Sequence, residues 1–76
     1  MSKITVSIFL VDGGLQEYEE NMDFLHTLRS LQSRGISGKQ LVNELISDDW
    51  GALPRRVEIS GEDAQGSRLD IRIPYS

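Results

Sequence analysis

The sequence predicts a two-layer α+β domain, in which a small antiparallel sheet of β-α-α-β-β order carries two helices on one face. Apolar and polar residues alternate near both ends of the chain, which is the period of a half-buried strand. Between these ends, apolar residues recur at helical spacing in two segments. The chain has 76 residues without a repeat or linker, so we expect one domain over residues 1–76.

The first strand is predicted at residues 3–11. Its core-facing residues are Ile4, Val6, Ile8 and Leu10. The opposite face is polar at Thr5 and Ser7 but apolar at Phe9 and Val11. Either this end of the strand is covered on both sides, or it presents a surface to a partner.

The next segment allows more than one structure. Asp12-Gly13-Gly14 is a strong turn signal. Residues 15–19 could form a short return strand, because Asp-Gly favours tight hairpins. They could also form an early helical turn, because Leu15 and Tyr18 have helical spacing. We favour a loop that leads into a helix.

The first helix is predicted at residues 21–33. Its apolar stripe consists of Phe24, Leu25, Leu28 and Leu31. Asn21 is suited to the N-cap position, and Gly35 is a natural stop signal.

The second helix is predicted to begin at Ser37, where Ser37 and Gln40 have the spacing of a capping box. Its buried face is predicted to consist of Leu41, Val42, Leu45 and Ile46. Gly51 follows Trp50 as a C-terminal stop, and Pro54 prevents continuation.

Two further strands are predicted at residues 55–60 and 68–73, joined by a polar loop at residues 61–66. Charge favours a register that pairs Glu58 with Arg68 and Arg56 with Asp70. A slip of two residues would place Glu58 opposite Asp70, which is unfavourable.

Composition narrows the function classes. The absence of cysteine excludes disulfides and thiolate metal sites. Twelve acidic and eight basic residues give a net charge of −4, which disfavours nonspecific nucleic-acid binding. The longest apolar run, residues 8–11, is too short to span a membrane, and no signal-peptide cleavage site follows it. We therefore expect a cytoplasmic protein, and the small core that a short chain can bury favours a homodimer.

Residues with catalytic or metal-binding chemistry have simpler structural explanations. His26 could be a general base, but its place in a helix is typical of an exposed residue. Glu17, Glu19, Glu20 and Asp23 lie near a helix start, where acidic residues are favourable, and they lack the spacing of a calcium loop. The sequence therefore predicts no enzyme activity, cofactor, metal or catalytic residue.

The function predicted is a noncatalytic interaction or regulatory protein that acts as a homodimer and binds a protein partner. Asp48 and Asp49 oppose the dipole at the predicted helix end, which hints at recognition. Trp50 and Tyr75 are aromatic and suited either to the core or to an interface. The candidate partner-binding residues are Phe9, Val11, Asp48, Asp49, Trp50 and Tyr75.

A second hypothesis is a winged-helix-like DNA-binding regulator. The order of helix, Gly35-Ile36-Ser37 turn, helix and hairpin resembles a winged helix-turn-helix. Leu31 and Glu44 depart from that pattern, since a small residue and an aliphatic residue are usual there. The second helix is acidic overall, and Glu62 and Asp63 lie at the would-be wing tip. Both features are unfavourable for contact with phosphates.

Overall fold

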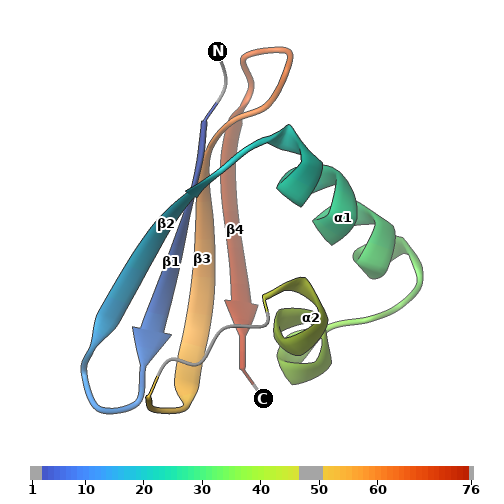
Figure 1. The fold of residues 1–76 in the computed structure, drawn as a ribbon. Helices are drawn as coiled ribbons and strands as arrows, with labels where there is room; N and C mark the ends of the chain where they lie inside the picture. Colours follow the sequence, from blue (N-terminus) through green and yellow to red (C-terminus); the bar gives the residue numbers. More distant parts are fainter. Residues whose placement is uncertain (1–2, 47–50, 76) are drawn as a thin grey trace.

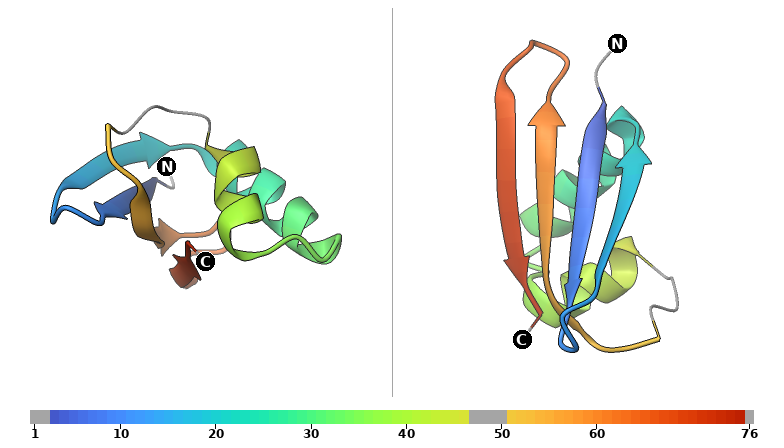
Figure 2. Two further views of the ribbon diagram at one scale, coloured as in Figure 1. Left: turned by 90° about the horizontal axis from the view of Figure 1, so that it is seen from below. Right: turned by 90° about the vertical axis from the view of Figure 1, so that its left-hand side faces the viewer.

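The fold is a four-stranded antiparallel sheet with two helices on one of its faces, as seen in the computed structural model (Figure 1). The structure describes residues 3–46 and 51–75. The elements are β1 (Ile4–Leu10), β2 (Leu15–Glu20), α1 (Met22–Ser33), α2 (Gly38–Leu45), β3 (Pro54–Glu62) and β4 (Arg68–Pro74). The strand order is β2-β1-β3-β4, and the other face of the sheet is open (Figure 2). The predicted two-layer α+β class is confirmed.

Strand β2 is the main addition to the predicted topology. The loop favoured for residues 15–19 is wrong, and the alternative hairpin is right. Leu10 donates a main-chain hydrogen bond to the Gly14 carbonyl at 2.8 Å, and the Asp12 carboxylate accepts one from the Gly14 amide. This turn directs the chain back along β1. Pairing with Val6 then places Tyr18 on the helix-covered side, where it is half-buried against the core.

Helix α1 begins and ends as predicted. The Asn21 side chain accepts a hydrogen bond from the Asp23 amide at 3.0 Å. At the other end, Gly35 has φ +82° and donates to the Gln32 carbonyl, while Ile36 donates to Leu31. This is a Schellman motif, which requires the left-handed conformation that glycine adopts readily.

Helix α2 differs from the prediction at both ends. Ser37 occupies the N-cap position, but its hydroxyl makes no capping hydrogen bond, so the predicted capping box with Gln40 is wrong. Gly38 has φ +59°, which turns the first residue of the helix away from the geometry that a capping box needs. The helix ends at Leu45, because Ile46 is already extended with φ −131°. Gly51 is therefore not its stop signal.

The β3–β4 register also differs from the prediction. Glu58 lies opposite Arg72 and Glu62 opposite Arg68, so the predicted pairing of Glu58 with Arg68 is wrong. Both registers pair opposite charges, and the turn decides between them. The Asp63 carboxylate accepts hydrogen bonds from the amides of Gln65 and Ser67, which closes a tight loop and extends both strands beyond the expected ends.

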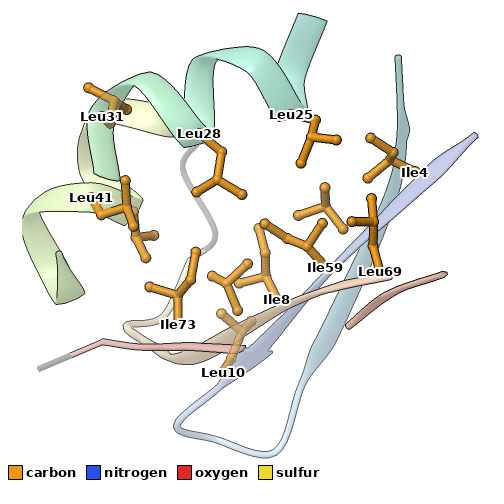
Figure 3. Close-up of a cluster of buried hydrophobic side chains, with 13 residues drawn as sticks. Ile4, Ile8, Leu10, Leu25, Leu28, Leu31, Leu41, Ile59, Leu69 and Ile73 are labelled. Atoms are coloured by element: carbon orange, nitrogen blue, oxygen red, sulfur yellow. The ribbon is translucent and has the colours of Figure 1, made fainter. Parts of the chain in front are cut away.

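The core lies between the sheet and the helices. Side chains from α1, including Leu25 and Leu28, point towards Ile8 and Ile59 on the strands (Figure 3). The buried hydrophobic residues are Ile4, Val6, Ile8, Leu10, Leu25, Leu28, Leu31, Leu41, Val42, Val57, Ile59, Leu69 and Ile73. Among the residues that the structure describes, no charged or polar residue is buried. One sheet face therefore supplies the core, and the other remains available for contacts.

Candidate partner-binding surface

Phe9 lies on the open face of the sheet, as the alternation in β1 predicts. The neighbouring residue Ile8 is fully buried on the helix-covered side. Phe9 is paired directly with Leu15 on β2 and with Arg56 on β3. Directly opposed residues in antiparallel strands project from the same face, so these three side chains form a row across the sheet.

Two more exposed apolar residues continue this row towards the β1–β2 turn. Val11 directly follows the last buried residue of β1, and Leu53 directly precedes the first buried residue of β3. The Val11 amide donates to the Leu53 carbonyl at 3.0 Å. The exposed fractions are 61% for Val11, 50% for Leu15 and 65% for Leu53. We call Phe9, Val11, Leu15 and Leu53 together the apolar end of the sheet, which lies where the β1–β2 turn meets the start of β3 (Figure 1).

The Phe9 ring is partly covered by a cation. The Arg56 guanidinium carbon lies 4.0 Å from the ring centroid. The Arg56 Nε atom donates a hydrogen bond to a Glu58 carboxylate oxygen at 2.7 Å. These contacts hold the guanidinium over the ring, in the geometry of a cation–π interaction. Phe9 is thus a half-buried, ordered base for the apolar end, and Arg56 forms part of its charged rim.

Polar and charged side chains cover the adjoining part of the open face. The Ser7 hydroxyl donates to the Glu17 carboxylate at 3.3 Å. Lys3 and Glu19 form an exposed ion pair at 3.4 Å. The open face therefore changes from apolar at the β1–β2 turn to polar along the strands. An apolar centre with a polar rim is the usual anatomy of a protein interface.

Of the remaining predicted partner residues, the structure describes only Tyr75, which contacts α2. Tyr75 follows Pro74 onto the helix-covered side, where its hydroxyl donates to the Asn43 side chain at 2.9 Å. The Lys39 ammonium lies 5.8 Å from its ring centroid. Tyr75 thus connects the end of β4 to α2. Asp48, Asp49 and Trp50 lie outside the described residues.

Sequence reasoning missed Leu15 and Leu53. Leu15 becomes a neighbour of Phe9 only when residues 15–20 form a strand, whereas the sequence favours a loop there. Leu53 directly precedes Pro54, which is buried at the start of β3. An isolated leucine before a proline carries no strand periodicity, so only the pairing of Val11 with Leu53 reveals its position.

The residues considered for catalysis or metal binding lie on exposed surfaces. His26 is exposed on α1, and Glu17, Glu19, Glu20 and Asp23 are exposed near its start. Over residues 3–46 and 51–75, no three His, Cys, Asp or Glu side chains gather as a metal site requires. Neither helix in the described part of the chain has the length and hydrophobicity of a membrane span. Comparison with protein-family models, curated proteins and solved structures finds no match to this chain.

Proposed function

We propose that this protein is a noncatalytic, cytoplasmic interaction module that binds a protein partner through the apolar end and acts as a homodimer. The observation that carries the proposal is the grouping of three large apolar side chains, each at least half exposed, beside Phe9. Single exposed apolar residues are ordinary on protein surfaces, but contiguous ones mark interaction sites. The partner predicted is a protein segment with apolar side chains that cover Val11, Leu15 and Leu53.

The apolar end can contribute part of the free energy of binding a partner. Full burial of a valine or leucine side chain contributes about 1.5–3 kcal/mol. Val11, Leu15 and Leu53 retain half or more of their exposure, so covering them contributes about 1 kcal/mol each. The ordered Phe9 ring adds a flat aromatic surface without a further loss of side-chain entropy on binding. A partner that covers all four residues therefore gains a compact apolar contact.

To test the proposal, the wild type and two variants are each used to capture binding proteins in the native cells, and the captured proteins are compared. The test variant is Val11→Ser with Leu53→Ser, which removes apolar surface from exposed positions. The control variant is Thr27→Ala with Gln32→Ala on the exposed side of α1. We expect the wild type and the control to retain the same partner and the test variant to lose it. Retention of the same partner by all three proteins would refute the proposal.

The winged-helix-like alternative makes a different prediction. A DNA-binding regulator would bind duplex DNA at low salt and release it as salt rises, because phosphate contacts displace counterions. The hairpin tip carries Glu62 and Asp63, and α2 carries Glu44, which repel phosphate. We expect no binding of the purified protein to duplex DNA at 50 mM salt. Salt-sensitive binding would favour the DNA-binding alternative.

A further inference from the structure

Strand β4 has an open edge with main-chain groups that face outward. In the sheet order, β4 has β3 on one side and no strand of the described residues on the other (Figure 2). The Asp63 amide donates to the Ser67 carbonyl, and the Tyr75 amide donates to the Arg55 carbonyl. These two hydrogen bonds show which residues of β4 direct their main-chain groups towards β3. Because hydrogen-bonding direction alternates along a strand, every second residue of β4 points its amide and carbonyl away from β3. These residues are Arg68, Asp70 and Arg72, together with Pro74, which has an outward carbonyl but no amide hydrogen.

The same residues form a charge pattern that is complementary to itself. We infer that the β4 strands of two copies pair antiparallel about Ile71 and join two sheets into one. This register places Arg72 opposite Asp70 of the partner subunit, and Asp70 opposite Arg72 of the partner subunit. Each of these residues directs its amide and carbonyl outward, so the pairs can exchange main-chain hydrogen bonds. The inference rests on the homodimer in the proposed function and assigns its interface.

Charge also selects this register over its neighbours. Shifts of two residues are the ones that keep the core-facing side chains of both sheets on the same side. A shift in one direction places Asp70 opposite Asp70 of the partner subunit, and a shift in the other places Arg72 opposite Arg72 of the partner subunit. Like charges directly opposed across strands are destabilising. The pairing centred on Ile71 therefore combines long overlap with matched charges.

The apolar side of β4 fits the same symmetry axis. Ile71 is only partly buried, although its neighbours on this side, Leu69 and Ile73, are buried. Pairing about Ile71 places it against Ile71 of the partner subunit, on the side that faces the helices. The second copy would thus cover the apolar residue that the edge of the sheet leaves partly exposed.

The opposite edge of the sheet is unsuited to pairing of this kind. Leu10 donates to Gly14, so along β2 the outward main-chain groups belong to Leu15, Glu17 and Glu19. If two copies of β2 paired antiparallel with full overlap, glutamates of the two copies would lie close together. Charged side chains on an edge strand are a common protection against unwanted pairing. When only one edge of each sheet can pair with another copy, the assembly is a closed twofold dimer and not an open fibre.

Charge-swap variants test this interface. Asp70 and Arg72 are both exposed, so Asp70→Arg and Arg72→Asp change the edge without altering the core. Analytical ultracentrifugation of the wild type should show a weak, concentration-dependent dimer of twice 8.6 kDa, because one strand buries less than the roughly 800 Å² per subunit of a standard interface. Either single variant should raise the dissociation constant about tenfold or more. Glu20→Arg, on β2, matches the charge change of Asp70→Arg and should leave the dimer unchanged.

Restoring complementarity should restore the dimer. The double variant Asp70→Arg/Arg72→Asp and an equimolar mixture of the two single variants both regain opposite charges in the proposed register. Recovery in both cases supports the interface. Dimers of unchanged strength in both single variants would overturn this interface while leaving the homodimer intact. A wild type that stays monomeric at about 1 mM would overturn the interface and the homodimer, but partner capture through the apolar end is measured separately.

Discussion

Gly61 is the residue at which a single methyl group should reveal how closely β1 and β3 approach. It lies opposite Ile4 in β1 and Leu69 in β4, inside the sheet and not in the hairpin loop. Its φ is +140°, a conformation that side-chain-bearing residues rarely adopt. A Cβ added there would overlap the Lys3 carbonyl oxygen and lie 3.2 Å from the Ile4 Cα. Both atoms are main-chain atoms, which cannot rotate away as a side chain could.

The expected cost follows from comparison with Gly66. Gly66 also has positive φ, at +82°, but nothing lies within 4 Å of its Cβ position. Gly66→Ala should therefore cost only the backbone strain, about 1–2 kcal/mol. Gly61→Ala adds the displacement of β1, so we expect a loss of about 3–4 kcal/mol. The difference of about 2 kcal/mol corresponds to roughly 8–16 °C in melting temperature for a domain of this size.

Urea unfolding followed by far-ultraviolet circular dichroism measures both variants against the wild type. The free energy of unfolding should fall in the order wild type, Gly66→Ala, Gly61→Ala. A Gly61→Ala protein that is unfolded without urea, beside a folded Gly66→Ala protein, agrees with this order. Equal losses within about 0.5 kcal/mol would refute the close approach of β3 to β1 at this position.

Three further experiments test separate parts of the fold. Asn21→Ala removes the side chain that caps α1 and should lower the free energy of unfolding by about 1 kcal/mol. Ser37→Ala should lower it by less than about 0.5 kcal/mol, because the Ser37 hydroxyl makes no capping hydrogen bond. Chemical denaturation compares the two variants, and equal costs would contradict the structure. Leu28→Ala empties a fully buried position and should cost about 2–5 kcal/mol by the same measurement, so a loss below 1 kcal/mol would contradict its central place in the core. A double-mutant cycle of Phe9→Leu and Arg56→Gln should give a coupling of about 0.5–1 kcal/mol, and no coupling would show that the guanidinium does not rest on the ring.

Much of the fold could be predicted from the sequence because its strongest signals are local. The alternation in β1, the stripe of α1 and the Asn21 cap depend on residues close together in the chain, and all three appear as predicted. The shorter α2 and the missing Ser37 hydrogen bond depend on main-chain angles, such as φ +59° at Gly38, that composition does not specify. The β3–β4 register was mispredicted because two registers satisfy the charges, and the Asp63 turn selects between them.

The candidate surface was predictable only in part, for a related reason. Phe9 and Val11 stand out within their own strand as apolar residues on a polar face. Leu15 and Leu53 belong to the same surface through pairing between strands, and periodicity within one segment cannot show that contact. Tyr75 was predicted as a partner residue, but its hydroxyl bonds to Asn43 of α2 in the structure. Interaction surfaces on a sheet are thus defined across strands, whereas sequence patterns describe each strand separately.

Binding through the apolar end is tested most directly by methyl NMR of the protein titrated with the partner that it captures. Signals from Val11, Leu15 and Leu53 report on the apolar end, and signals from the buried residues Leu28 and Val42 serve as internal controls. We expect the signals of Val11, Leu15 and Leu53 to shift or broaden as the partner is added, while those of Leu28 and Val42 stay in place. Shifts confined to Leu45 at the end of α2 and to Ile46 directly after it, with the apolar end unchanged, would contradict this expectation.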